Sequence, residues 1–176
     1  MPVWHFRERH SIRISAPPAR VFASIKEVRA KEIFFFNVLV WIRRGGRSGP
    51  ESILNPGASA PLLEVATRSG FIYLADDAPR ELVVGTVVIA PRGIDCAATP
   101  QMFRAALEPG YALAAMNFLV TPDGRNGSLV STETRVFANS LSARRRFARY
   151  WRLIYPGSAL IRRMWLRAVK KRVTRG

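Results

Sequence analysis

The sequence predicts an α+β fold in which a curved antiparallel sheet wraps around a long C-terminal helix. Three observations support this prediction: an alternating apolar segment near the N-terminus, two hairpin patterns in the middle of the chain, and a long amphipathic segment at the end. The chain has 176 residues, of which 48% are apolar and 23% are charged. These values are typical of one globular domain, so we expect residues 1–176 to form a single domain.

The first expected strand covers His5 to Ser15, where apolar and polar residues alternate. Its apolar face consists of Phe6, Ile12 and Ile14, which places Glu8 and His10 on that same face. The strand ends at Ala16-Pro17-Pro18, because proline cannot donate a hydrogen bond to a neighbouring strand. Pro18 suits the first turn of a helix, which we expect to continue through Ile25.

The next part of the chain is less clear. Arg29 to Arg44 is rich in strand-forming residues but is long enough for a helix, which we favour. Gly45 to Pro50 is then expected to be a loop, and Pro56-Gly57 a turn. Ser59 to Gly70 is expected to be a helix, because Ser59 can cap its start and Gly70 can adopt the left-handed conformation after its end.

Two hairpins are expected to follow. The first pairs residues 71–75 with 82–90 across an acidic, proline-containing turn at 76–80. The second pairs Tyr111 to Thr121 with Ser128 to Ala138. Alternation in this second hairpin places Met116, Phe118, Val120, Val130, Thr132, Thr134 and Val136 on the inward face and Asn117, Ser131, Glu133 and Arg135 on the outward face.

The C-terminal segment is basic and amphipathic. Thr134 to Gly176 contains thirteen Arg or Lys and no Asp or Glu, so it carries +13 of the net charge of +16. We expect a helix from about Ser142, with a stripe that includes Phe147, Trp151 and Trp165 facing the sheet. Pro156-Gly157 is expected to kink or split this helix. The arginines are expected to occupy mostly its other faces.

The order of these elements resembles the START-like, or SRPBCC, superfamily. The resemblance is carried by the opening strand-Ala16-Pro17-Pro18-x-x-Val21-Phe22 passage and by the Tyr150-Trp151-Arg152-x-x-x-x-Pro156-Gly157-Ser158 segment. This helix-grip superfamily includes birch-pollen-allergen-like proteins, polyketide cyclases and coenzyme Q-binding proteins. The resemblance implies that a hydrophobic small molecule or lipid-like ligand binds between the sheet and the last helix. The sequence departs from the usual pattern in showing five clear strands instead of six or seven.

The polar residues on the first strand are the main candidates for a functional role. If that strand pairs with the last one, as the resemblance implies, Glu8 and His10 lie near Thr132 and Thr134. Buried polar groups of this kind often mark functional sites. The alternative is that Glu8 and His10 face water or form a structural pair. The candidate ligand-binding residues are Glu8, His10, Tyr73, Met116, Phe118, Thr132, Thr134, Trp151 and Trp165.

We expect binding of a ligand without covalent chemistry, as in a carrier or sensor. An alternative is a polyketide cyclase or dehydratase-like enzyme, in which Glu8 or His10 would transfer protons. Nucleophilic hydrolysis is disfavoured, because the sequence contains no G-x-S-x-G turn. With one cysteine and two histidines, the sequence also predicts no metal site, and we expect no cofactor.

The basic tail suggests a further partner. Its charge favours contact with polyanions, either an anionic membrane surface or nucleic acid, but the sequence contains no motif for specific nucleic-acid recognition. The alternative is that the arginines form an ordinary solvated face. Residues 1–10 lack the apolar segment of a secretory signal, so we expect a cytoplasmic protein that could contact a membrane peripherally.

Overall fold

The computed structural model describes residues 3–29, 32, 60–68, 70–94 and 97–175. In chain order the elements are β1 (Phe6–Ile14), α1 (Pro18–Glu27), α3 (Leu62–Arg68), β2 (Ile72–Asp77), β3 (Glu81–Ile89), the short 3-10 helix η2 (Pro100–Phe103), β4 (Ala112–Pro122), β5 (Ser128–Ala138) and α4 (Leu141–Arg175). The expected segments Arg29 to Arg44, 45–50 and 56–57 lie almost entirely outside the described residues.

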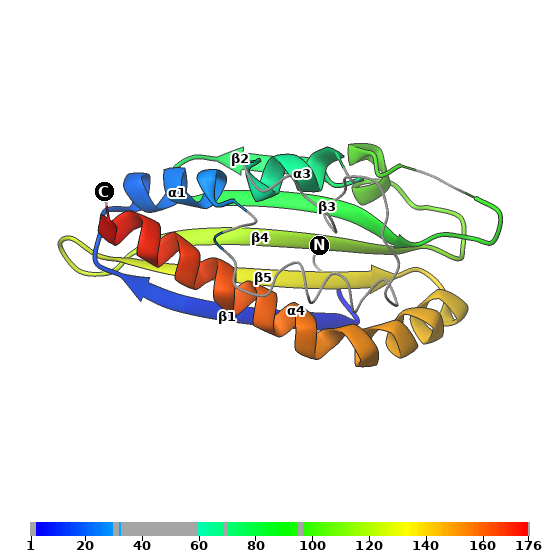
Figure 1. Cartoon of the computed structure of the whole chain (residues 1–176). Coiled ribbons are helices and arrows are strands. Elements are labelled where there is room, and N and C mark those ends of the chain that lie inside the picture. Colours follow the sequence, from blue (N-terminus) through cyan, green and yellow to red (C-terminus); the bar gives the residue numbers. More distant parts are fainter. Residues whose placement is uncertain (1–2, 30–31, 33–59, 69, 95–96, 176) are drawn as a thin grey trace.

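The strands form one antiparallel sheet in the order β1-β5-β4-β3-β2. Figure 1 shows the curved sheet with α4 lying across β1 and β5, while α1 lies beside the C-terminal end of α4. The first strand therefore pairs with the last one, which leaves β1 and β2 at the two edges. The α+β class and the sheet closed by the C-terminal helix are confirmed.

The register places residues from all five strands in continuous rows across the sheet. Glu8 lies opposite Thr134, which lies opposite Met116. Two residues further along, His10 lies opposite Thr132, which lies opposite Phe118. Because directly paired residues point to the same face, each row begins with an ionisable side chain on β1, passes a threonine on β5 and reaches an apolar side chain on β4.

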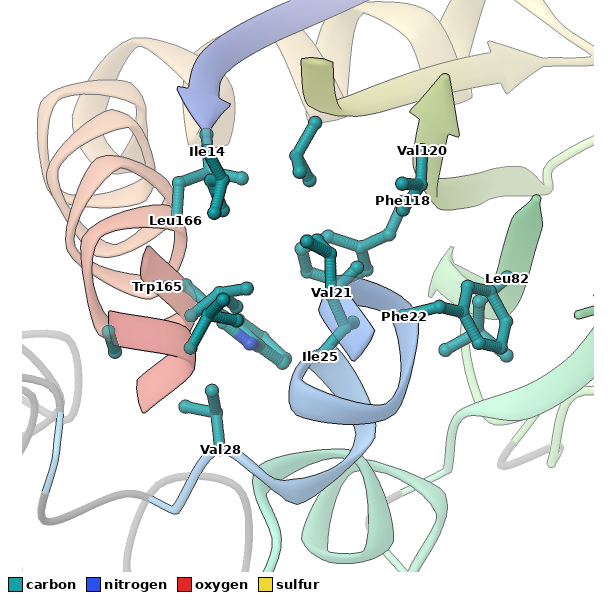
Figure 2. Packing of buried hydrophobic residues seen from close by; sticks show 14 of the residues in the cluster. Ile14, Val21, Phe22, Ile25, Val28, Leu82, Phe118, Val120, Trp165 and Leu166 are labelled. Atoms are coloured by element: carbon teal, nitrogen blue, oxygen red, sulfur yellow. The ribbon is translucent and has the colours of Figure 1, made fainter. Parts of the chain in front are cut away.

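Two hydrophobic clusters lie between the sheet and the helices. Figure 2 shows part of the larger one, in which Val21 and Ile25 of α1 approach Phe118 of β4 and Trp165 of α4. The smaller cluster is built around Phe147 of α4, whose ring lies 4.9 Å from that of Phe6 on β1. The helix α4 therefore contacts one cluster with each half of its length.

The helix α4 begins slightly earlier than expected and is not divided. The hydroxyl of Ser140 accepts a hydrogen bond from the Ala143 N–H at 3.2 Å, which caps the first turn before Leu141. Of the two alternatives expected at Pro156-Gly157, a kink or a split, the split does not occur, because α4 is one helix with Pro156 inside it. Its axis bends in the orange part of Figure 1, as proline within a helix predicts.

The other expected elements are confirmed with small shifts. The helix expected over Ser59 to Gly70 is shorter, because α3 starts only after Pro61. Gly70 has φ +90°, the left-handed conformation that the sequence predicts after the helix. In the first hairpin the strands extend further into the turn, leaving only residues 78–80 between β2 and β3.

The outward face of the sheet carries an ion-pair network centred on Glu133 of β5. Arg7 donates to this carboxylate from Nε at 3.0 Å, and Arg135 donates to it from the same strand. The expectation that Glu133 points outward holds, although these neighbours leave it only 8% exposed. Burial raises the pKa of Glu133, but the hydrogen bonds from Arg7 and Arg135 and their charges together lower it by more. The pKa of Glu133 is therefore below the ordinary 4.5.

We predict that Phe147→Ala destabilises the protein by about 3 to 5 kcal/mol, because it removes a buried ring that joins α4 to β1. Leu153→Ala on the same helix is the matched control, since Leu153 is 82% exposed. Its free energy of unfolding should change by less than about 0.5 kcal/mol. Urea unfolding followed by circular dichroism measures both values. Similar losses in the two variants would show that this half of α4 is not docked.

We predict that Glu133→Gln lowers the free energy of unfolding by about 1 kcal/mol at pH 7. Because the folded-state pKa is lowered, the stabilisation is present above the unfolded pKa and is lost as pH falls through the folded one. The difference from the parent protein should therefore shrink as the pH falls below 4.5. The exposed Glu108→Gln variant controls for the charge change, and a difference that stays constant from pH 7 to the acid limit of folding would contradict this account.

Candidate functional site

A buried carboxylate lies between the sheet and the last helix. Glu8 of β1 is 3% exposed, and both of its carboxylate oxygens are engaged. Oε1 lies 2.7 Å from His10 Nε2, and Oε2 accepts a hydrogen bond of 2.9 Å from the hydroxyl of Ser158 on α4. The expectation that Glu8 could be left in water is therefore wrong, whereas the structural pair with His10 is present.

The positive partner of this carboxylate is Arg162, one turn further along α4. Its Nε lies 3.6 Å from Glu8 Oε2, and its Nη1 donates a hydrogen bond of 3.1 Å to the Thr132 hydroxyl. The Arg162 side chain is only 12% exposed. Burial lowers its pKa to about 10, and Glu8 opposes that change. Arg162 is therefore still charged at neutral pH, and the pair brings opposite charges together in a largely apolar layer.

His10 is held from both sides. Arg163 Nε lies 3.4 Å from His10 Nδ1, and a guanidinium can only donate hydrogen bonds. His10 Nδ1 is therefore the acceptor, so the ring proton lies on Nε2 and is donated to Glu8. This assignment follows from the hydrogen-bond geometry. Both ring nitrogens of His10 therefore have partners.

The local structure explains why these side chains meet. Glu8 and His10 are two residues apart on β1, and therefore point to the same face of the strand. Ser158, Arg162 and Trp165 are four and three residues apart on α4, which places them on one face of the helix. The antiparallel register then adds Thr134 opposite Glu8 and Thr132 opposite His10. We call Glu8, His10, Thr132, Ser158 and Arg162 the polar cluster.

Three buried polar atoms beside this cluster have no hydrogen-bond partner among the described residues. They are Thr134 Oγ1, Arg162 Nε and Trp165 Nε1. Thr134 is 6% exposed and Trp165 is 7% exposed. All three atoms can donate a hydrogen bond, and they belong to residues of β5 and α4. Such groups are uncommon in folded proteins, and each one requires an explanation.

Apolar groups surround these donors. The rings of Phe118 and Trp165 lie 4.9 Å apart, and Figure 2 shows them approaching each other from β4 and α4. Met116 is partly buried against the same cluster. On the other side of the polar cluster lies the smaller hydrophobic cluster around Phe147. The polar cluster is therefore enclosed between two apolar regions.

Two of the expected ligand-binding residues lie apart from this group. Tyr73 is 46% exposed on the edge strand β2, four strands away from Glu8, a distance of roughly 19 Å at the usual spacing. Trp151 belongs to the smaller hydrophobic cluster, where its ring lies 5.6 Å from that of Phe147. The remaining candidates, Glu8, His10, Met116, Phe118, Thr132, Thr134 and Trp165, come together on the inward face.

Sequence reasoning did not identify Ser158 or Arg162 as site residues. Arg162 was expected among the arginines on the outer faces of α4, and the structure corrects this. The signal that could have found it is spacing, because Arg162 lies three residues before Trp165 and four after Ser158, within the apolar stripe. Arg162 was assigned to the exposed faces because it is charged, and charged residues are seldom buried without a partner.

The described residues were also compared with the requirements of a metal site and of a membrane-spanning helix. Within the described ranges, no group of three or more His, Cys, Asp or Glu residues is placed to hold a metal ion. A search of the same ranges finds no helix with the length and apolar character needed to cross a membrane.

Comparisons with solved structures find proteins of similar length that align over nearly the whole chain. Protein MLL2253 from Mesorhizobium loti aligns at a TM-score of 0.46 and 14% identity, covering 97% of this chain and 98% of its own. A conserved protein from Geobacillus kaustophilus aligns at 0.39 and 10%, covering 97% and 96%. Ara h 8.0201 aligns at 0.30 and 9%, covering 97% and 99%. No family model matches the chain, and no curated protein sequence matches it.

The arrangement of elements itself identifies the architecture. An N-terminal edge strand pairs with the last strand, successive hairpins complete the sheet, and the long α4 lies across it. The chain has the helix-grip fold. The expected helix-grip architecture is confirmed, with five strands in the described part of the chain.

We predict that Arg162→Met destabilises the protein by about 3 kcal/mol, because it leaves the Glu8 carboxylate buried without its positive partner. Glu8→Gln should also destabilise, because it leaves Arg162 uncompensated. The double variant should lose at least about 1 kcal/mol less than the sum of the two single losses. Urea unfolding of the four proteins gives this coupling energy. Additive losses would contradict a direct interaction between the two charges.

Proposed function

We propose that this protein binds a small apolar molecule carrying a hydrogen-bond acceptor, such as a carboxylate or carbonyl group, between the sheet and α4. The observation that supports this proposal most directly is the set of three buried donors at Thr134, Arg162 and Trp165. The ligand's acceptor would receive hydrogen bonds from these groups. Its apolar part would contact the Phe118 and Trp165 rings and Met116.

The energetic argument concerns the cost of burying donors without partners. A buried polar group that makes no hydrogen bond destabilises the folded protein by about 1 to 3 kcal/mol. Three such groups in one layer would destabilise a small domain substantially, since its total stability is only about 5 to 15 kcal/mol. A ligand acceptor would offset this cost on binding. Binding sites for small molecules commonly combine apolar walls with a few polar anchors of this kind.

The polar cluster has a distinct role in this proposal. Glu8 neutralises Arg162 and fixes its position, while Thr132 holds one end of the guanidinium. His10 and Ser158 in turn hold the two oxygens of Glu8. The guanidinium is therefore oriented with an Nε–H that donates no hydrogen bond to a described residue. Such preorganisation lowers the cost of ordering a binding group.

The same geometry favours binding over proton transfer. A general base must reach the proton that it abstracts, but Glu8 is only 3% exposed and each of its oxygens already has a partner. Both nitrogens of His10 also have partners. The cyclase or dehydratase-like alternative would require these hydrogen bonds to be exchanged for contacts with a substrate. We therefore propose that Glu8 and His10 position Arg162. The protein would then act as a binding protein, such as a carrier or a sensor.

The proposal predicts that the protein binds cis-parinaric acid, a fluorescent apolar carboxylic acid, and that Thr134→Val weakens this binding about 5- to 10-fold. The factor corresponds to the loss of one hydrogen bond of about 1 kcal/mol. Valine has nearly the same shape as threonine, so the ligand-free protein should be at least as stable as the parent. Fluorescence titration and thermal unfolding measure the two effects.

Two further variants make the test specific. Trp165→Phe keeps an aromatic ring but removes the indole N–H, and should weaken binding by a similar factor. Thr121→Val is the matched control, because the Thr121 hydroxyl already bonds to the Leu129 carbonyl away from the site, and it should leave affinity unchanged. Failure of the parent protein to bind the probe, or unchanged affinity in both site variants, would overturn the proposal.

A further inference from the structure

The outward face of α4 combines exposed apolar residues with a high positive charge. Leu153 is 82% exposed and Leu160 is 41% exposed, and both lie on the same face of the helix as the exposed Pro156. Arg149 precedes this group by one turn on that face, and Arg167 follows it. A short apolar strip therefore lies in the middle of a basic ridge, on the side of α4 opposite Phe147 and Trp165.

The charge of this ridge is not neutralised within the described part of the protein. Arg145, Arg149, Arg152 and Arg167 are all exposed, and none of them forms an ion pair with a described residue. By contrast, Arg162 and Arg172 on other faces of the same helix pair with carboxylates. The sequence after Glu133 contains no Asp or Glu that could reduce the potential. The outward face is therefore complementary to an anionic surface.

The apolar strip distinguishes between possible anionic partners. Nucleic-acid backbones would be attracted by the arginines, but they offer no apolar region for exposed leucines. A lipid bilayer offers both, because its headgroups attract basic residues and its acyl boundary accepts aliphatic side chains. Pro156 and the two leucines project between the arginines, in the position that would reach below the headgroups. The exposed aliphatic carbons and the surrounding charge are thus explained by one partner.

We propose that the outward face of α4 docks the protein on an anionic lipid bilayer. Arg149, Arg152 and Arg167 contact the headgroups, while Leu153 and Leu160 insert shallowly beside them. The opposite face of the same helix remains on the sheet, so docking does not require α4 to leave the fold. The proposal is independent of the ligand proposed above, because the two use different faces of α4.

The test uses the full chain with vesicles of phosphatidylcholine alone, or with 30% phosphatidylglycerol (about one lipid in three, enough for a strong surface potential). Co-flotation should occur with the anionic vesicles and not with the neutral ones. Arg149→Gln with Arg152→Gln should lower the partition coefficient about 30-fold, since each basic residue contributes roughly 1 kcal/mol near anionic lipid. Leu153→Ser with Leu160→Ser should lower it about tenfold or more without changing the charge.

Matched controls place the same chemical changes elsewhere. Arg92→Gln with Arg125→Gln removes two exposed arginines from loops, and Ile94→Ser removes an aliphatic residue that is 48% exposed. Partitioning of these variants should fall less than about threefold, because only the long-range charge term is reduced. Circular dichroism checks that every variant is folded.

Several results would overturn the docking proposal. Equal binding, or equal failure to bind, with neutral and anionic vesicles would do so. If the leucine variant bound vesicles normally while duplex DNA competed fully with them, the face would be a general polyanion site and not a bilayer surface. Loss of vesicle binding with normal binding of cis-parinaric acid would reject this proposal alone. The reverse pattern would reject only the proposed ligand site.

Discussion

The buried pair of Glu8 and Arg162 is the constraint on which the rest of the arrangement depends. It joins the first strand to the last helix, although these elements are separated by most of the chain. Two opposite charges in an apolar layer are tolerated only when they pair and when their remaining polar atoms find partners. Ser158 and His10 supply such partners to the two oxygens of Glu8, and Thr132 supplies one to Arg162 Nη1. Arg162 Nε is the polar atom of the pair without a hydrogen bond to a described residue. The position of α4 on the sheet is therefore specified by chemistry as well as by apolar packing.

Two hydrophobic clusters flank this pair and hold one face of α4 against the sheet, which leaves the other face exposed. Phe147 holds the first half of the helix against β1, and Trp165 holds the second half against β4. The inward face can then present donors to a ligand, while the outward face remains free to carry exposed leucines and arginines. A protein that exchanges an apolar molecule with a membrane would use both surfaces at once, because the proposed ligand site and the proposed bilayer contact lie on two faces of one helix.

The sequence predicts most of the fold because its strands alternate clearly and its turns contain the expected residues. The alternation of β4 and β5 correctly predicts which of their residues face the helices, although the outward-facing Ser131 and Glu133 are buried as well. The pairing of β1 with β5 places Glu8 beside Thr134. The sequence does not reveal Arg162, because a charged residue in a basic helix is indistinguishable from its solvated neighbours until its partner across the fold is known. The sequence also does not reveal that Tyr73 lies far from Glu8, because that distance depends on the order of the strands in the sheet.

The most direct test of this account is the titration of the Arg162 guanidinium, followed by NMR of its Nε nucleus between pH 7 and pH 12. The account predicts that Arg162 loses its proton near pH 10, because burial lowers its pKa more than the nearby Glu8 raises it. The Arg162→Met variant assigns the signal, and amide spectra at each pH verify that the protein is folded. An Arg162 signal that shows no loss of a proton up to pH 12 would contradict the burial of this side chain.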